Sequence, residues 1–302
     1  MIGLRHFLDI TDLEAGELHK VLELAERPIS GLGTPLREQG VGLIFEKPSN
    51  RTRQSMELAV TQLGGHPVYT RGDEVGFDVR ETVEDVTRIM QGYHGLLAAR
   101  VFDHAVLERM VAVASIPVVN LLSDRSHPMQ GLADVLTMRQ VGGPLAGRTV
   151  SWVGDYNNVA RSLFEASAML GAHLRMACPD GFGPDHAELE RFVTLGAASV
   201  ESFARPDDAV VGADAVHTDT WTSMGQETQA DQRRRAFEGF QVTPELMAKA
   251  ATGAGFFHCM PAHRGEEVSA AVFDGPASHV IRQGHNRMHA ARGLLAFVLG
   301  VR

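Results

Sequence analysis

The stretch Phe45-Glu46-Lys47-Pro48-Ser49-Asn50-Arg51-Thr52-Arg53-Gln54-Ser55 decides how the chain folds around it. It follows a short apolar run typical of a buried strand, and it leads into residues with helical spacing. Ser49 or Asn50 is a suitable N-cap, so Arg51 and Arg53 are expected on the first helical turn. Free backbone N–H groups and the helix dipole favour an anion there. The turn therefore predicts a phosphate site, although a capped helix with two solvated arginines has the same spacing.

The composition is that of a globular protein in water. The 302 residues suffice for two domains of ordinary size, and 44% hydrophobic with 22% charged residues can form a substantial core. The 28 basic and 37 acidic residues give a net charge of −9, and no basic stretch dominates, so nucleic acid is not an expected partner. An anionic substrate must be held by local arginines against this unfavourable field.

Cysteine usage and the N-terminus indicate where the protein works. Cys178 and Cys259 are too few for a disulfide framework and fit no metal cluster, which predicts a reducing compartment and no bound metal. The first six residues contain no apolar signal core, and no run is long enough to cross a bilayer. We therefore expect a cytoplasmic protein without membrane contact.

Strand and helix patterns alternate along the chain with short connections. The expected strands are residues 41–45, 68–69, 95–100, 118–121, 149–154, 174–179, 198–201, 215–219 and 256–259. Such alternation predicts the α/β class, with mainly parallel sheets flanked by helices. Gly142-Gly143-Pro144 is the best linker, so we expect two doubly wound domains. The polar stretch 71–79 contains two glycines and is expected to be an exposed loop.

Polar groups follow the expected strands, at the positions where open α/β sheets bind ligands. These groups are residues 49–53, Arg100, 127–130, 157–158, 219–226 and 258–267. Singly, each has a structural explanation. A histidine before a proline is often a cap, paired asparagines form turns, and a cysteine on an apolar strand is usually a small buried hydrophobe.

Taken together and in this order, the groups resemble the motifs of the ornithine carbamoyltransferase family, from about residue 3 to the end of the chain. The turn at Ser49 resembles Ser-Thr-Arg-Thr-Arg, residues 127–130 resemble His-Pro-x-Gln, and 153–158 resemble a Gly-Asp-x-Asn-Asn turn. Residues 219–227 are similar to the family's Ser-Met-Gly loop, and 258–261 to its His-Cys-Leu-Pro. Residues 286–289 resemble the Asn-Arg-x-His that starts its last helix.

This resemblance implies transfer of the carbamoyl group of carbamoyl phosphate to the δ-amino group of L-ornithine, giving L-citrulline and phosphate, in arginine metabolism. It implies a carbamoyl phosphate-binding domain over residues 1–140, joined by a C-terminal helix over 285–302, and an ornithine-binding domain over 145–284. It further implies a homotrimer or a multiple of trimers, and no metal or organic cofactor.

The resemblance also assigns site residues. Those implied for carbamoyl phosphate are Ser49, Asn50, Arg51, Thr52, Arg100, His127, Gln130, Cys259, Met260 and Arg287. Those implied for ornithine are Asn158, Asp219, Ser223 and Met224. The catalytic set is Arg100, His127, Asp219 and Cys259.

Elementary chemistry agrees with this assignment. A phosphate dianion needs arginines and helix-start amides, and the charge that develops on the carbamoyl oxygen needs donors such as Thr52, Arg100 and His127. The attacking amine must be neutral, although a free amine is mostly protonated near neutral pH. Asp219 and Cys259 can orient it and accept a proton or hydrogen bond. Direct attack by the amine needs no acyl-cysteine.

The chain departs from the family pattern at three places. Asn50 stands where the family usually has threonine, so an amide replaces a hydroxyl in the phosphate turn. Met56 replaces a usual phenylalanine, which predicts a packing change. The stretch 71–79 lacks the glutamine that some relatives extend into a neighbouring subunit's site.

Three alternatives stay open on the sequence. The nearest is a carbamoyltransferase acting on another amine, such as putrescine or a modified ornithine; aspartate enzymes share the phosphate turn but not the Ser-Met-Gly loop. A catalytically silent carbamoyltransferase-like binding protein has only Asn50 in its favour. A dinucleotide-binding dehydrogenase fits less well, because residues 154–158 lack the glycine fingerprint.

Overall fold

The chain forms two compact units in the computed structural model, which describes residues 4–222 and 227–302. The first unit comprises Met1–Ala133 and His285–Arg302, and the second comprises Asp134–Gly284. The chain therefore passes between units inside two helices, α6 (Pro128–Gly142) and α13 (Val280–Val298). Among the described residues, no helix combines the length and the apolar character needed to span a membrane.

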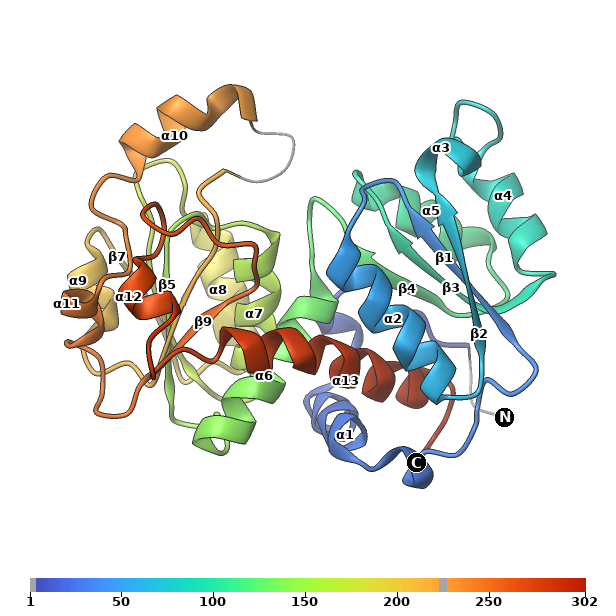
Figure 1. Ribbon diagram of the computed structural model, residues 1–302, viewed down its shortest axis with the longest axis horizontal. Helices are drawn as coiled ribbons and strands as arrows, with labels where there is room; N and C mark the ends of the chain where they lie inside the picture. The colour runs from blue at the N-terminus through green and yellow to red at the C-terminus, as the bar shows by residue number, and fades with distance from the viewer. Residues whose placement is uncertain (1–3, 223–226) are drawn as a thin grey trace. The chain divides into compact units, whose positions relative to one another are not determined.

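The first unit is built on a parallel four-stranded sheet with the order β2-β1-β3-β4 (Figure 1). Its strands are β1 (Gly40–Phe45), β2 (His66–Arg71), β3 (His94–Arg100) and β4 (Val118–Leu122). Because β2 and β3 pair with opposite edges of β1, the winding reverses at β1. Loops that leave the carboxyl ends of strands at such a reversal separate and create a crevice for ligands.

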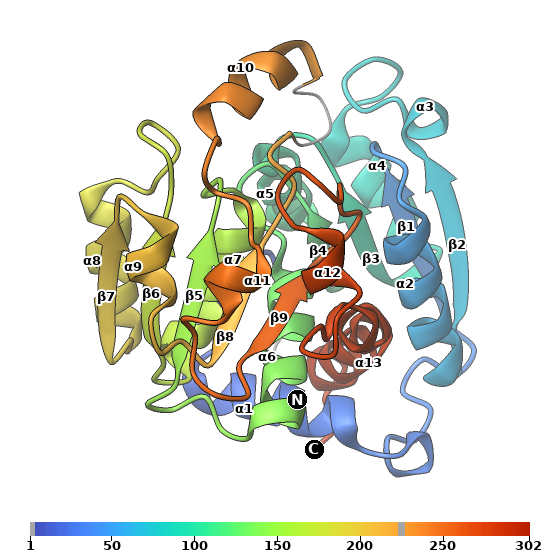
Figure 2. The ribbon, with the colours of Figure 1, turned by 60° about the vertical axis from the view of Figure 1, so that its left-hand side comes forward.

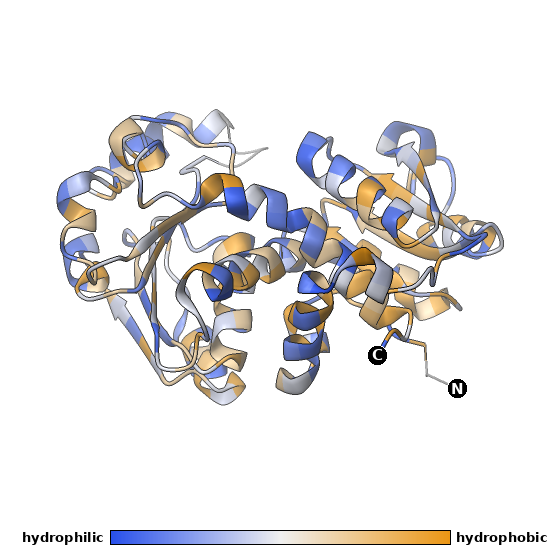
Figure 3. Ribbon diagram, turned by 60° about the horizontal axis from the view of Figure 1, so that its bottom comes forward, coloured by the Kyte–Doolittle hydropathy of each residue, from blue (hydrophilic) through white to orange (hydrophobic). Residues whose placement is uncertain are grey.

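Helices cover this sheet on both faces. They are η1 (Ile10–Asp12), α1 (Ala15–Glu26), η2 (Ile29–Gly31), α2 (Asn50–Gln62), α3 (Gly72–Val75), α4 (Val83–Met90) and α5 (His104–Val113). On one face Ile44 and Leu97 of the sheet pack with Val86 of α4 and Leu107 of α5 in a buried cluster. β1, β3 and β4 are accordingly buried over most of their length, whereas the edge strand β2 is not. Figure 3 shows hydrophobic ribbon in both sheets and helices.

The second unit repeats the principle with a parallel five-stranded sheet in the order β7-β6-β5-β8-β9 (Figure 2). Its strands are β5 (Thr149–Val153), β6 (His173–Ala177), β7 (Ser199–Phe203), β8 (Ala215–Thr218) and β9 (Gly255–His258). Here the winding reverses at β5, because β6 and β8 pair with its opposite edges.

The helices of the second unit again cover both faces of the sheet. They are α7 (Asn158–Met169), α8 (His186–Leu195), α9 (Pro206–Val210), η3 (Glu227–Gln229), α10 (Ala230–Ala236), α11 (Pro244–Met247) and α12 (Ala270–Phe273). One buried cluster joins Val216 and Phe256 of the sheet to Val210 of α9, Leu246 of α11 and Val272 of α12.

The predicted α/β class is confirmed: both sheets are parallel and doubly wound, and the C-terminal helix belongs from His285 onward to the first unit. One local expectation is wrong. The expected loop 71–79 contains α3, whose end is closed by Gly76 in the left-handed region at φ 59°.

Candidate active site

In the first unit, three adjacent strands deliver predicted site residues to one edge of the sheet. Phe45, the last residue of β1, pairs with Arg100, the last residue of β3, and Arg100 pairs with Leu122 at the end of β4. The phosphate turn follows β1, and His127 follows β4 immediately before α6. Parallel pairing alone therefore brings the turn, Arg100 and His127 to the same edge.

The phosphate turn is held by its own cap and by an arginine from the far end of the chain. Ser49 caps α2 by accepting the Thr52 N–H at 3.4 Å, and such caps stabilise a helix by about 1 kcal/mol. Arg287 Nη2 donates to Thr52 Oγ1 at 2.7 Å, and Arg287 Nη1 donates to Gln130 Oε1 at 2.7 Å. Thr52, Gln130 and Arg287 are all buried. One guanidinium thus fixes the start of α2 against the start of α6.

His127 is buried, and three arginines of the first unit act on it electrostatically. Burial, followed by the positive charges of Arg287, Arg100 and Arg51, holds the pKa of His127 well below its ordinary value of 6.5. The imidazole is therefore neutral near pH 7, whereas a free histidine is still partly protonated there. A neutral ring beside three guanidiniums can donate one N–H without adding charge.

Two residues of the turn, Asn50 and Arg53, bind side chains of their own helix. Asn50 is exposed, and its Oδ1 accepts a hydrogen bond from Gln54 Nε2 at 2.7 Å. Arg53, expected beside Arg51 at the anion site, instead binds Glu57 at 2.8 Å and lies 3.8 Å over the ring of Tyr69. Arg53 thus lies on the first turn of α2 as expected, but its guanidinium is engaged by a carboxylate one turn along the helix and by an aromatic ring on β2, and its part in anion binding stays a prediction.

Lys47 is a cation of this region that the sequence analysis did not select. Its Nζ lies 4.3 Å from the centre of the Phe102 ring, and burial together with the charge of Arg100 lowers its pKa. The signal was present in the sequence, since a lysine two residues before the helix cap at the end of a strand already faces the ligand edge.

In the second unit, β5, β8 and β9 are likewise adjacent and end in predicted site residues. Thr218 of β8 pairs with His258 of β9, so Asp219 and Cys259 follow neighbouring strand ends. Asn158, expected to bind ornithine, is the half-buried first residue of α7. Ser223 and Met224 lie outside the described residues.

Asn157, the residue before Asn158, links the turn after β5 to Asp219. Its Oδ1 accepts the N–H groups of Val159 and Ala160 at 2.9 and 3.1 Å, which caps α7. Its Nδ2 donates to Asp219 Oδ2 at 2.8 Å. The paired asparagines of the sequence signalled a turn, but nothing in the sequence revealed which of them binds the carboxylate.

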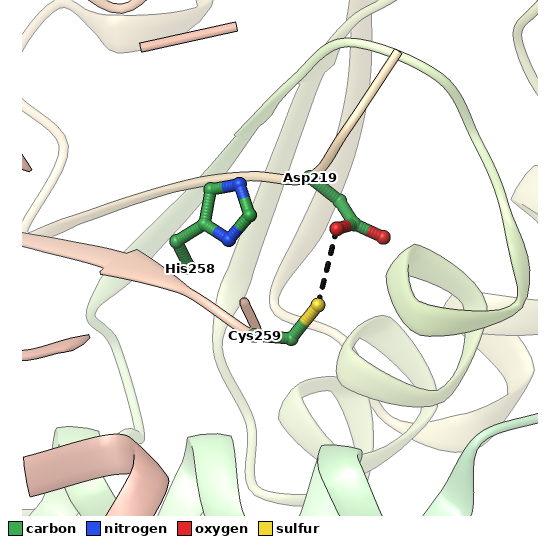
Figure 4. A group of neighbouring side chains, drawn as sticks. All are labelled: Asp219, His258 and Cys259. Atoms are coloured by element: carbon green, nitrogen blue, oxygen red, sulfur yellow. Dashed lines mark hydrogen bonds between the residues drawn. The ribbon is translucent and has the colours of Figure 1, made fainter. Parts of the chain in front are cut away.

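Asp219 and Cys259 form the centre of the second group. Cys259 Sγ donates to Asp219 Oδ1 at 3.1 Å, and Figure 4 shows the thiol pointing toward that carboxylate. The Thr220 N–H also donates to Oδ1, at 2.8 Å. With Asn157 this makes three donors among the residues that the structure describes, whereas a carboxylate offers about four lone-pair positions, so the carboxylate could accept one further donor such as an amine.

Met260 follows Cys259 in a constrained backbone. Its φ of 59° lies in the left-handed region, which non-glycine residues rarely adopt, and its bond to Pro261 is cis. A left-handed residue of this kind costs about 1–2 kcal/mol and persists only where surrounding contacts hold it. The turn at Cys259-Met260 is therefore a built feature of the site.

In the described part of the chain, two groups of side chains have the composition of a metal site. Ligand atoms of Asp219, His258 and Cys259 lie within 4.8 Å of one another, as do those of His263, Glu266 and Glu267. In the first group both ring nitrogens of His258 are engaged, Nδ1 by the Met260 N–H at 2.8 Å and Nε2 by Glu267 at 3.1 Å. His258 thus has no lone pair to offer a cation in this arrangement.

Comparisons with known proteins match both units. Residues 5–140 match the carbamoyl-P binding domain of the aspartate/ornithine carbamoyltransferase family, and residues 146–298 match its Asp/Orn binding domain. The two matches together extend over most of the chain.

Individual relatives are similar over nearly their whole length. The ornithine carbamoyltransferase of Thermus thermophilus is 43% identical over 297 residues, covering 98% of this chain and 97% of the relative. That of Hyperthermus butylicus is 44% identical over 306 residues, with the same coverage of 98% and 97%. The solved structure of ornithine carbamoyltransferase from Pyrococcus furiosus superposes with a TM-score of 0.93 at 40% identity, covering 99% of this chain and 98% of that one.

Proposed function

The chain belongs to the aspartate/ornithine carbamoyltransferase family, and from this premise we propose that it is an ornithine carbamoyltransferase. It transfers the carbamoyl group of carbamoyl phosphate to the δ-amino group of L-ornithine and yields L-citrulline and phosphate. The observation that carries the proposal is the buried Arg287, whose guanidinium joins Thr52 to Gln130, two residues of the part of the chain that matches a carbamoyl-P binding domain.

We assign the first unit's group to carbamoyl phosphate. The phosphate dianion would be held by the amides and side chains of the helix start at Ser49, Asn50, Arg51 and Thr52, together with Arg287. Arg100, His127 and Thr52 would donate to the carbamoyl oxygen, on which negative charge grows during attack. Gln130, whose Oε1 already accepts from Arg287, would contact the carbamoyl NH₂ group.

We assign the second unit's group to ornithine. Asp219 and Cys259 would take the amine, with Asn158, Ser223 and Met224 at the α-amino and α-carboxylate ends, and Cys259 and Met260 would also border the carbamoyl group. The δ-ammonium first loses a proton to solvent, and Asp219 and Cys259 orient the neutral amine. The nitrogen lone pair then forms a bond to the carbamoyl carbon, the bond from that carbon to the phosphate oxygen breaks, and the nitrogen gives its second proton to the departing phosphate.

We further propose the domain assignment and setting that family membership supports. Residues 1–140 with 285–302 would form the carbamoyl phosphate-binding domain, and 145–284 the ornithine-binding domain. The working assembly would be a homotrimer or a multiple of trimers in the cytoplasm. The reaction as written is a polar group transfer, and each step is supplied by side chains, without a metal or organic cofactor.

A citrulline assay with a panel of amines tests the proposal. Purified protein would be incubated with carbamoyl phosphate and, separately, ornithine, N-acetylornithine, putrescine and aspartate. We expect rapid product formation with ornithine and little with the others. Product from putrescine or aspartate but not from ornithine would overturn the substrate, and no product from any amine would favour a silent binding protein.

A further inference from the structure

A buried carboxylate stands behind the Cys259-Met260 turn, and no step of the proposed reaction uses it. Glu267 is fully buried, and so is His258, to which it is bonded through Nε2 at 3.1 Å. The same oxygen, Oε1, accepts the backbone N–H of His263 at 2.6 Å. Glu267 is itself anchored, because its carbonyl accepts the Val242 N–H at 2.9 Å.

The hydrogen bonds around His258 fix its tautomer. His258 Nδ1 lies 2.8 Å from the Met260 nitrogen, and a backbone amide can only donate, so Nδ1 must carry the lone pair. The proton is therefore on Nε2 and is donated to Glu267. The ring itself is held in place, since its backbone N–H donates to Gln283 Oε1 at 2.9 Å and Phe273 packs edge-on against it.

The turn that this ring holds is the one that carries the Cys259 thiol, which is proposed to take the amine together with Asp219. Met260 keeps its left-handed φ of 59° with its N–H on His258, and Cys259, between them, reaches Asp219 at 3.1 Å. If the tautomer changed, an N–H on Nδ1 would face the N–H of Met260 and the turn would lose that bond. Glu267 thus acts on the thiol through His258 and Met260.

We propose that Glu267 is a positioning residue, which sets the tautomer of His258 and thereby holds the Cys259-Met260 turn in the geometry that the carbamoyl transfer requires. This inference rests on the proposed function, which it deepens by one residue that contacts neither substrate. Any side chain at 267 that accepts a hydrogen bond from His258 Nε2 should preserve the turn, whether or not it is charged.

Three variants separate positioning from a simple contribution to the fold. Glu267→Gln keeps an acceptor for His258, Glu267→Leu removes it, and Glu266→Gln makes the same chemical change on the neighbouring carboxylate, which binds Arg234 at 3.0 Å. Each is made with Cys178→Ser, so that Cys259 is the single thiol. Burial raises the pKa of Cys178 to about 12, so its thiol is mostly protonated near neutral pH, and its removal should not alter the reaction.

We expect kcat/KM for ornithine, per folded protein, to fall at least about tenfold in Glu267→Leu, because loss of a buried acceptor commonly has an effect of this size. In Glu267→Gln and Glu266→Gln it should stay within about threefold of the value for the unsubstituted protein. Two readouts do not depend on turnover. In ¹⁵N-histidine-labelled protein, with the His258 signal assigned through His258→Asn, the proton should be on Nε2 in all but Glu267→Leu. The rate at which iodoacetamide alkylates Cys259 should change in Glu267→Leu alone.

These readouts keep the inference separate from the proposed function, because both can be measured on a protein that makes no citrulline. A proton on His258 Nδ1 in the unsubstituted protein would overturn the inference. So would a folded Glu267→Leu variant with unaltered tautomer and thiol reactivity, since Glu267 would then support only the fold.

Discussion

The two groups of site residues are built on the same plan and carry opposite charge. Each lies at the carboxyl ends of three adjacent parallel strands, β1, β3 and β4 in the first unit and β5, β8 and β9 in the second. The first gathers guanidiniums around a neutral imidazole, whereas the second gathers a thiol and an amide around one carboxylate. The first suits a dianion and the second a cationic amine.

The opposite charges of the two groups explain how a chain of net charge −9 could bind a phosphate dianion at one group and an ammonium at the other. The topology supplies two equivalent edges, and the residues placed there decide which ligand each edge accepts. Substitutions that reverse or erase the charge of one group should therefore affect one substrate and spare the other.

The largest effect is expected from the cationic group. Arg100→Ala or Arg51→Ala should lower kcat by more than about 100-fold, because a donor aimed at developing charge is lost. Arg53→Ala is the matched control, since that guanidinium binds Glu57 and Tyr69, and it should stay within about threefold. Steady-state citrulline kinetics check both. Unchanged turnover in Arg51→Ala and Arg100→Ala would place the carbamoyl site elsewhere.

The anionic group should show the complementary loss. Asp219→Asn removes the charge that Cys259 and Asn157 surround, so kcat/KM for ornithine should fall about 30-fold, within the usual value of a charged hydrogen bond. KM for carbamoyl phosphate should change less than about threefold. Asp208→Asn, an exposed change in the same unit, serves as the control. An unaltered response to ornithine would refute this role for Asp219.

The buried His217 of the second unit should make the free energy of unfolding depend on pH. Burial lowers the pKa of His217 to about 3, with a smaller contribution from His258. Its folded pKa is below its unfolded value, so the unfolded state binds the proton first and stability falls as pH drops below about 6.5. Between pH 7 and pH 5 this amounts to about 2 kcal/mol for this one group.

Urea unfolding at both pH values measures this difference. The His217→Gln variant should lose about 2 kcal/mol less than the unsubstituted protein over the same interval. An identical loss in both proteins would mean that His217 is not the group that titrates on unfolding.

The smallest effect is expected at the unusual residue of the phosphate turn. Asn50 is exposed and bonded to Gln54 through Oδ1, so Asn50→Thr should change KM for carbamoyl phosphate less than about threefold. Asn50→Asp places a negative charge at the same position and should raise that KM about tenfold. Titrating carbamoyl phosphate at fixed ornithine compares the two. Equal constants in Asn50→Thr and Asn50→Asp would show that position 50 does not face the phosphate.

The fold could be predicted because its strands are buried on both faces and appear as continuous apolar runs between helical patterns. Their order within the sheets could not be derived from those runs. The edge of the sheet on which Arg100, His127, Asp219 and Cys259 would lie was predictable for the same reason, since each follows a strand.

The contacts between distant residues could not be predicted from local patterns. Arg287 reaches Thr52 across 235 positions, and only the family resemblance indicated it. Local patterns also did not reveal that the Arg53 guanidinium binds Glu57 on its own helix and lies over the ring of Tyr69 on β2. Glu267 lies within the polar stretch 258–267 that the sequence singled out, but nothing in that stretch indicated its bond to His258.

The proposed function is tested most directly by following the bond between the carbamoyl carbon and the δ nitrogen of ornithine. The protein would be given ¹³C-labelled carbamoyl phosphate and ornithine labelled with ¹⁵N at the δ position, and the product examined by NMR. We expect citrulline whose carbonyl carbon shows a one-bond coupling to the δ nitrogen, released in equal amount with phosphate. Phosphate release without that coupling, or coupling to the α nitrogen, would contradict the account.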